Sequence, residues 1–402
     1  MGAVDDLSCY RAPSPLVTRI LHLFPVSEIG GAETVLLNLI RFRKRSDVEH
    51  RVVVAAAQSG PLGAALTRLG VPWQQVPRGR MRWPGSLWRI CRQFRRIVQE
   101  SGAEVVLTNS PQGFLYARWA TIGLRVPVVL YYMTVPQRRL WRNGPLDILA
   151  AKSRPAATFT ASHAISRIVT GWGLSNVHTV YHGIPVEFPQ ASAITDREEC
   201  LLRLGIRRTD PVVLLPGRLQ AWKGQHILIA SFPEVLKVCP NAHAVLIGGS
   251  LFGQDPEYAD RLQRQIAALS LTGRVHLLGH QPPAAWLDRA DVVVHASTGP
   301  DPFPLVCIEA LAARRPLITN RLSGTCEILV EERDAVIVEP NDAAALARGI
   351  IRLLSDPEKA RQMAEAGHRR YLDTCTPAPM VQTIETALVD LSARSRTVVC
   401  PA

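Results

Sequence analysis

The chain has 402 residues, of which 47% are hydrophobic and 20% are charged, with a formal net charge of +12. This composition excludes a disordered chain, and the length predicts more than one domain because single hydrophobic cores stop growing near about 250 residues. The eight cysteines are scattered and form no C-x-x-C pair, which argues against a disulfide framework or a zinc knuckle and favours a reducing cytosol. We expect no signal peptide and no membrane-spanning segment, because the apolar stretches are too short.

The positive charge is concentrated in the first half of the chain. Residues 1–182 hold 23 basic and 9 acidic residues, a net charge of +14, whereas residues 183–402 hold 23 basic and 25 acidic residues, a net charge of −2. Two interpretations stay open: an anionic partner contacts the first half, or the arginines form a solvated surface.

Strand-like and helix-like segments alternate through this first half. Short apolar runs predict seven strands, at residues 17–23, 51–56, 71–76, 104–107, 126–132, 157–161 and 177–181. A helix is expected from Ala32 to about Arg45, and the other intervening segments have helical composition. Strands separated by helices indicate βαβ units and a parallel sheet.

Residues 183–210 interrupt the alternation with a Gly-Ile-Pro segment and a polar stretch, which predicts a linker. Beyond it the alternation resumes, with strands expected at residues 212–215, 243–247, 275–278, 291–295, 316–319 and 335–338. Residues 342–392 are expected to be helical, with one break at Thr376 and Pro377.

These patterns predict two doubly wound, Rossmann-like α/β domains that face each other across a cleft. The expected boundaries are a tail at 1–16, domains at 17–182 and 211–372, and a C-terminal helix and tail at 373–402. Because ligands of such sheets bind at the carboxyl ends of the strands, the loops at these ends are the candidate functional segments.

The first candidate loop contains Gly30 and Gly31, between a strand and a helix. Glycines let the backbone approach a ligand closely, and the N-terminus of a helix favours an anion such as phosphate. A tight strand-to-helix turn without a ligand is the alternative.

The second candidate loop places Arg218 and Lys223 between Gly217 and Gly224, again before a helix. An arginine fork and a lysine point charge at a helix N-terminus would neutralise a diphosphate. Two solvated surface cations are the alternative.

The third candidate segment contains Asp301, a helix expected to open near Leu305, and Glu309 one turn inside that helix. We expect both carboxylates to face one crevice at different depths, where they would accept hydrogen bonds from the hydroxyls of a ribose or hexose. A capping aspartate and an ordinary helical glutamate are the alternative.

Together these segments are similar to the signature of glycosyltransferase family 4, whose members have the GT-B fold. The resemblance rests on residues 30–33, 217–225 and 301–309, and it covers residues 17–372 in order and spacing. Other matching pieces lie at residues 180–184, 247–249, 278–279, 324–327 and 338–342.

The resemblance implies a retaining transferase that moves a sugar from a nucleotide-sugar donor to a glycan or lipid-linked acceptor of the cell-envelope type. Its implied catalytic residues are Asp301, Glu309, Arg218 and Lys223. Its implied substrate-binding residues are Gly30, Gly31, Gly217, Arg218, Lys223, Gly248, Gly249, Gly279, His280, Asp301, Phe303, Pro304, Leu305, Val306 and Glu309.

By the same resemblance, backbone N–H groups of Gly31, Leu305 and Val306 would bind the diphosphate. Asp301 would hold the donor sugar, Glu309 would hold the ribose, and His280 would border the base. No D-x-D motif is present, so we expect cations and helix dipoles to replace a metal, and we expect no cofactor.

Two departures from the family pattern leave a second hypothesis open. Phe303-Pro304 replaces the usual Phe-Gly pair and Asp301 replaces a glutamate, and the histidine that many members carry after the strand at 128–132 is absent. A catalytically silent nucleotide-binding or scaffold paralogue is therefore the alternative function.

A basic, aromatic-rich segment spans residues 78–96. From Pro84 onward it predicts an amphipathic helix, and a second basic patch lies at residues 138–142. An anionic membrane surface is one predicted partner, and a core-facing helix with solvated arginines is the alternative. We expect a cytoplasmic protein, with peripheral binding to the inner membrane face left open, and no nucleic-acid partner. The arginines predicted to contact the membrane are Arg80, Arg82, Arg89, Arg92, Arg95 and Arg96.

Overall fold

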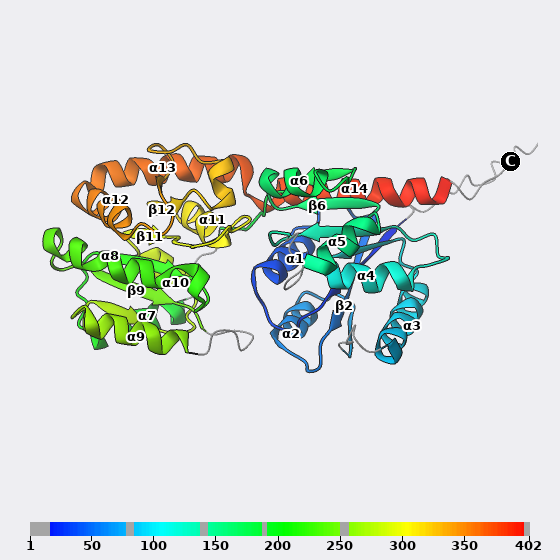
Figure 1. The fold of residues 1–402 in the computed structure, drawn as a ribbon, viewed down its shortest axis with the longest axis horizontal. Helices are drawn as coiled ribbons and strands as arrows, with labels where there is room; N and C mark the ends of the chain where they lie inside the picture. The colour runs from blue at the N-terminus through cyan, green and yellow to red at the C-terminus, as the bar shows by residue number, and fades with distance from the viewer. Residues whose placement is uncertain (1–16, 78–83, 137–143, 187–190, 250–256, 398–402) are drawn as a thin grey trace, which may run out of the picture.

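Two parallel sheets, each covered by helices, form two domains that lie side by side (Figure 1). The structure is a computed structural model, and it describes residues 17–77, 84–136, 144–186, 191–249 and 257–397. The predicted fold class, two doubly wound Rossmann-like domains, is confirmed.

The sheet of the first domain has seven strands in the order β3-β2-β1-β4-β5-β6-β7. The strand order reverses between β1 and β4, which pair directly, so the crevice for a ligand in this sheet lies beyond their carboxyl ends. All seven predicted strands are confirmed to within a few residues. They are β1 (Thr18–Phe24), β2 (Val48–Ala55), β3 (Trp73–Val76), β4 (Val105–Thr108), β5 (Val128–Tyr132), β6 (Ala157–Thr160) and β7 (Val177–Thr179).

The connections between these strands are helical, as the alternation predicts. The first helix ends earlier than expected, at Arg41 instead of about Arg45, because residues 43–46 are polar and offer no apolar side chain to bury. The helices are α1 (Gly31–Arg41), α2 (Pro61–Arg68), α3 (Pro84–Ser101), α4 (Pro111–Ala120), α5 (Gly144–Lys152) and α6 (His163–Thr170).

The sheet of the second domain has six strands in the order β10-β9-β8-β11-β12-β13. Its strand order reverses between β8 and β11, which are also direct neighbours. The six predicted strands are confirmed. They are β8 (Val212–Pro216), β9 (His243–Ile247), β10 (Val275–Leu277), β11 (Val292–Val294), β12 (Leu317–Asn320) and β13 (Val336–Val338).

The helices of the second domain correct two expectations. The segment 183–210 is not only a linker, because it contains α7, which packs on α10 and buries Leu201. The helical C-terminal region has a further break at Asp356, whose carboxylate caps the next helix. The helices are α7 (Ala191–Arg203), α8 (Gln225–Val238), α9 (Tyr258–Ala268), α10 (Pro283–Arg289), α11 (Leu305–Ala312), α12 (Ala343–Ser355) and α13 (Pro357–Thr374).

The last helix, α14 (Pro377–Thr397), returns to the first domain (Figure 1, red). Its apolar side chains Val381, Ile384 and Leu388 are fully buried in a cluster with Ile20 of β1 and Val105 of β4. The core of the first domain is therefore completed by residues that follow the second domain in sequence.

Candidate active site

The candidate site begins where the sheet of the second domain reverses its strand order. The loop after β8 leads into a short 3₁₀ helix, η1 (Ala221–Lys223), and the loop after β11 leads to Asp301. The two loops are in contact, because Thr298 donates its N–H to the carbonyl oxygen of Trp222 at 2.7 Å. At Gly224, φ is 75° and a Cβ atom would collide with the carbonyl oxygen of Ala296, so only glycine allows this approach.

This approach brings Lys223 and Asp301 together. The Lys223 Nζ atom lies 2.6 Å from Asp301 Oδ2, and only 17% and 8% of the two side chains are exposed. Burial by itself would raise the pKa of Asp301, but the charge of Lys223 and a hydrogen bond from His295 outweigh it and hold that pKa well below its usual range. The site therefore contains a fixed, largely buried ion pair.

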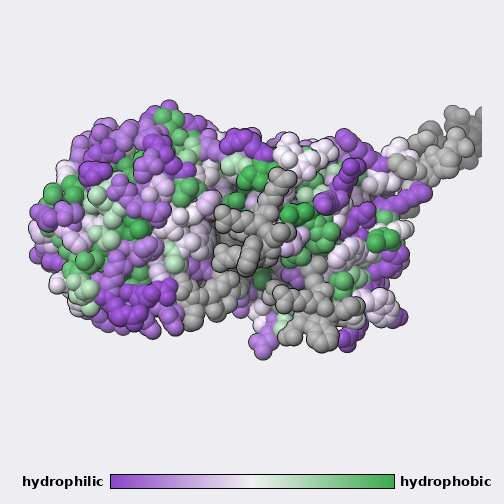
Figure 2. All heavy atoms as spheres, viewed as in Figure 1, coloured by the Kyte–Doolittle hydropathy of each residue, from purple (hydrophilic) through white to green (hydrophobic). Residues whose placement is uncertain are grey.

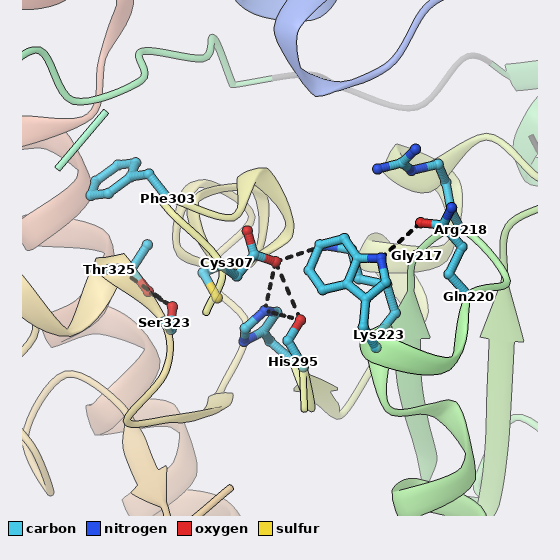
Figure 3. Close-up of polar contacts among 12 residues, drawn as sticks. Gly217, Arg218, Gln220, Lys223, His295, Phe303, Cys307, Ser323 and Thr325 are labelled. Atoms are coloured by element: carbon cyan, nitrogen blue, oxygen red, sulfur yellow. Dashed lines mark hydrogen bonds and ion pairs between the residues drawn. The ribbon is translucent and has the colours of Figure 1, made fainter. Parts of the chain in front are cut away.

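Two further side chains contact the same carboxylate oxygen (Figure 3). His295 Nε2 lies 3.1 Å and Ser297 Oγ 3.2 Å from Asp301 Oδ2, while His295 Nδ1 lies 3.0 Å from Thr319 Oγ1. From sequence, His295 is expected only as the last residue of the strand at 291–295. The signal that could have found it is a polar residue at a strand end, six positions before the acidic residue of the same loop.

Arg218 lies between acidic residues of both domains. In Figure 3 its guanidinium group points away from His295. Burial lowers the pKa of Arg218, and the charges of Asp301 and of Glu33 in α1 oppose that shift. Burial likewise raises the pKa of Glu33, whose carboxylate accepts the Gly30 N–H at 3.0 Å. Arg218 therefore links the second domain electrostatically to the first turn of α1.

Two helix N-termini meet across this space. A Cβ atom on Gly31, the first residue of α1, would lie 3.7 Å from the side chain of Leu305, the first residue of α11. Pro304 precedes α11 as its N-cap, and Val306 lies in its first turn. Since helix N-termini carry a partial positive charge, their convergence beside Arg218 creates a region suited to a diphosphate.

Glu309, in the second turn of α11, lies in a different part of the site from Asp301. It lines a cavity of about 250 Å³ between the domains. Asp301 does not line this cavity, so the expectation that both carboxylates face one crevice is corrected. The other described residues that line it are Thr34, Asn38, Ile184, Pro185, Val186, Pro283, Ala284, Leu287, Ala312 and Ala313.

The loops after β8, β9 and β10 are bound together by backbone contacts. Gly248 has φ of 138°, and a Cβ atom there would collide with the carbonyl oxygen of Gly217. The Gly248 N–H donates to the carbonyl oxygen of Gly279 at 2.6 Å. His280 is exposed next to Gly249 at the edge of these loops. Gly217, Gly248, Gly249 and Gly279 thus form a glycine rim at these strand ends, with His280 beside it.

Phe303 packs against the crossover between the domains. Its ring is buried and stacks on Tyr181 at a centroid distance of 4.8 Å, and its carbonyl oxygen contacts His182 Nδ1 at 3.2 Å. Burial lowers the pKa of His182 to about 4. We call these contacts of Phe303 with Tyr181 and His182 the joint between the domains. Because the Phe303 side chain packs in this joint, its direct contact with substrate stays a prediction.

A second contact between the domains comes from Glu327, in the 3₁₀ helix η2 (Gly324–Glu327). Its two carboxylate oxygens accept the N–H groups of His163 and Ala164 at 2.7 Å each, and Tyr181 donates its hydroxyl at 3.2 Å. A residue of the second domain therefore caps the N-terminus of α6 in the first domain.

The basic helix predicted from Pro84 is confirmed as α3. Arg89, Arg92 and Arg96 are exposed, while Ile90 and Phe94 are buried on the opposite face. Arg95 donates to the carbonyl oxygens of residues 120 and 122, so its guanidinium is used within the domain. Arg80, Arg82 and the basic patch at 138–142 lie outside the described residues.

Two Rossmann-like domains with a site between them are the architecture of GT-B proteins. The family model described as glycosyl transferases group 1 matches residues 196–370, and the model described as Glycosyltransferase Family 4 matches residues 29–188. The chain therefore belongs to glycosyltransferase family 4.

The chain is similar to curated proteins of different specificity. It is 34% identical over 164 residues to the glycogen synthase of Mycobacterium tuberculosis, which is 40% of this chain and 39% of that protein. It is 24% identical over 302 residues to the alpha-D-kanosaminyltransferase of Streptomyces kanamyceticus, covering 70% of this chain and 75% of that protein. The first of these matches thus spans about two fifths of the relative's length.

A crystal structure shares the fold over almost the whole chain. Anabaena Alr3699/HepE in complex with UDP-glucose superposes with a TM-score of 0.81 at 23% identity, covering 92% of this chain and 99% of that one. None of the helices in the described part of this chain is long and apolar enough to cross a membrane.

Proposed function

We propose that the protein is a retaining glycosyltransferase that takes a sugar from a nucleoside-diphosphate sugar and moves it to a glycan or lipid-linked acceptor of the cell-envelope type. The observation that carries the proposal is the Lys223–Asp301 pair at 2.6 Å, beside Arg218 and the converging N-termini of α1 and α11. The UDP-glucose bound to Alr3699/HepE supports a nucleotide-sugar donor.

In this proposal the diphosphate binds between the two domains. Negative charge develops on it as the bond to the anomeric carbon breaks, and Arg218, Lys223 and the helix N-termini stabilise that charge in the transition state. The acceptor hydroxyl attacks from the face that the diphosphate leaves. Its proton passes to the leaving phosphate oxygen, so the anomeric configuration is retained.

We assign the rest of the donor by position. Glu309 and the cavity of about 250 Å³ would hold the nucleoside, with Glu309 accepting the ribose hydroxyls. The glycine rim with His280 would border the base. Asp301 would accept a hydroxyl of the donor sugar.

We further propose that transfer needs no metal ion or other cofactor. Two cations and two helix dipoles converge on the proposed diphosphate position, which is the charge compensation that a divalent ion would otherwise supply. Addition of a chelator should leave turnover unchanged, and restoration of a chelated sample by magnesium or manganese would contradict this.

The acceptor side of the proposal rests on the first domain. Arg89 and Arg92 are exposed on α3, and Arg92 stacks on the ring of Trp88, which is 61% exposed. An exposed aromatic ring among arginines suits the interface of an anionic bilayer. On the part of the face that Figure 2 colours, the hydrophobic residues are scattered among hydrophilic ones, so charge would contribute most of this binding. These residues support our proposal that the enzyme binds peripherally to the inner membrane face.

The test is release of nucleoside diphosphate from a panel of UDP-, GDP-, ADP- and dTDP-sugars by the purified chain, with and without acceptor extracts. We expect one donor to be consumed by the wild type well above the rates of Lys223→Ala and Glu309→Ala. Binding of a nucleoside diphosphate with equal background rates in all three proteins would instead indicate a silent nucleotide-binding protein.

A further inference from the structure

We propose that His295 is the positioning residue of the donor-sugar site: it holds one oxygen of Asp301 inside the protein so that the other faces the sugar. The proposal rests on the proposed function, since it assumes a nucleotide-sugar donor. It adds a role for His295, whose ring is contacted on its other nitrogen by the Thr319 hydroxyl.

All described hydrogen bonds to the Asp301 carboxylate converge on a single oxygen. Oδ2 is contacted by Lys223 at 2.6 Å, His295 at 3.1 Å and Ser297 at 3.2 Å. Within the described part of the chain, no group donates to Oδ1. Oδ1 is also not among the described buried atoms that lack a partner, and 8% of the Asp301 side chain is exposed. The carboxylate is therefore anchored by one oxygen and open at the other.

The contact with Asp301 requires a proton on one particular ring nitrogen of His295. Because Asp301 is ionised, His295 Nε2 must carry the proton that it shares with Oδ2, and Ser297 Oγ lies 2.9 Å from the same nitrogen. His295 Nδ1 lies 3.0 Å from Thr319 Oγ1, and the Thr319 hydroxyl can either donate to this nitrogen or accept from it. The Cys307 thiol donates in turn to Thr319 Oγ1 at 3.7 Å.

The pairing of β11 with β12 holds His295 and Thr319 in these positions. Val294 of β11 pairs with Ile318 of β12, and the His295 N–H donates to the carbonyl oxygen of Ile318 at 2.9 Å. His295 and Thr319 are therefore held next to each other by the register of the two strands. Both side chains are buried, at 4% and 0% exposure, so their contacts do not compete with water.

In this arrangement the two residues of one ion pair bind different parts of the donor, Lys223 the diphosphate and Asp301 the sugar. Lys223 needs Asp301 nearby to stay in place, but a carboxylate free to rotate would offer both oxygens to the lysine and neither to the sugar. With Oδ2 held by His295 and Ser297, the lysine is placed for the diphosphate and Oδ1 for a sugar hydroxyl. Loss of His295 should therefore weaken recognition of the sugar more than recognition of the diphosphate.

The experiment is calorimetric titration of UDP and UDP-glucose, or of the matching pair that the donor panel selects, into the wild type, His295→Ala, His295→Gln and His276→Gln. Removing a hydrogen bond to a charged group should weaken nucleotide-sugar binding about tenfold or more in His295→Ala, while nucleoside-diphosphate binding stays within about twofold. His295→Gln restores an N–H donor and should recover most of the loss. His276→Gln, at another buried histidine of the same sheet, should leave the ratio of the two affinities unchanged.

Equal losses for both ligands in His295→Ala, no loss for either, or failure of His295→Gln to rescue would overturn the positioning role. A wild-type protein that binds neither ligand would instead refute the proposed function, and the inference with it. A wild type that distinguishes the two ligands while His295→Ala distinguishes them equally well would refute the inference alone.

Discussion

The two domains share a fold but differ in what their strand ends carry. In the second domain, the ends of β8, β11 and β12 hold the buried network of Lys223, Asp301, His295 and Thr319. In the first domain, the corresponding edge of β1, β4 and β5 opens on a cavity of only about 10 Å³, lined mainly by apolar side chains such as Met133. The same topology thus places charged, hydrogen-bonded side chains at the strand ends of the second domain and mostly apolar side chains at those of the first.

The domain with the charged strand ends is not the domain with the positive net charge. The first 182 residues carry a net charge of +14 and the rest −2, yet the cations that converge on the candidate diphosphate site belong to the second part. In the proposed site, the anion would therefore be bound by a few cations that folding holds in place, and not by the overall charge. The excess in the first domain is available for an anionic surface or acceptor.

The largest expected effect in this comparison comes from Lys223. Lys223→Ala should lower kcat by about 10²- to 10³-fold, because it removes a preorganised cation where charge develops. The control is Lys237→Ala, an exposed lysine of the same domain paired with Glu234, which should leave kcat unchanged. Steady-state transfer rates measure both, and a Lys223→Ala rate within threefold of the wild type would rule out the assigned role.

Stability must be separated from catalysis in that variant. Lys223→Ala leaves the buried Asp301 without its cation, which costs about 3–5 kcal/mol in comparable buried pairs. The double variant Lys223→Ala/Asp301→Asn removes the unpaired charge. It should recover much of the melting temperature without recovering turnover, whereas recovery of both would show that the single variant had only lost folded protein.

The joint between the domains should be sensitive to acid through His182. Its pKa is about 4 in the folded chain against about 6.5 when unfolded, so the unfolded state binds more protons between these values. The free energy of unfolding should be unaffected above pH 6.5 and fall as the pH drops, by about 2 kcal/mol at pH 5 from this group. Urea unfolding of wild type and His182→Asn at pH 7 and pH 5 measures this; equal pH dependence in both proteins would refute the assignment.

The basic surface gives a test of similar size on the first domain. Arg89→Ser/Arg92→Ser should lower partitioning to phosphatidylserine vesicles about thirtyfold, at about 1 kcal/mol for each arginine. The matched control is Arg261→Ser/Arg264→Ser, two exposed arginines on α9 of the second domain. Vesicle sedimentation reports both, and an equal loss in the two double variants would show only a general charge effect.

The smallest expected effect is at the cap of α6. Glu327→Ala should lower the free energy of unfolding by about 1–2 kcal/mol, because two N–H groups of the first domain lose their carboxylate. Glu331→Ala, in an exposed pair with Arg321, is the control and should change stability by less than about 0.5 kcal/mol. Urea unfolding distinguishes them; identical values would mean that the Glu327 contact contributes nothing to stability.

Most of the fold follows from local sequence patterns. The thirteen predicted strands are confirmed because most of them are short, buried apolar runs between helical segments, and both the run and its spacing are visible in sequence; β3 and β7 are only partly buried. The loop glycines are visible for a similar reason, since a strand-to-helix turn at Gly30 or Gly217 is a local feature.

Contacts between distant residues are not visible in this way. Glu327 and His163 are 164 positions apart, and α14 follows the second domain yet completes the core of the first. The direction of Asp301 depends on the register of β11 and β12 and on a glycine at position 224. Sequence therefore identifies the charged residues of the site, whereas only the folded chain determines which oxygen of Asp301 is free.

The most direct test of the account is a crystal structure of the chain with the nucleoside diphosphate of its donor. We expect the diphosphate between the domains, within hydrogen-bond reach of Lys223 Nζ, the Arg218 guanidinium and the N–H groups of Gly31 and Leu305. A diphosphate bound elsewhere, with Lys223 and Arg218 making no contact to it, would contradict the assignment of this site.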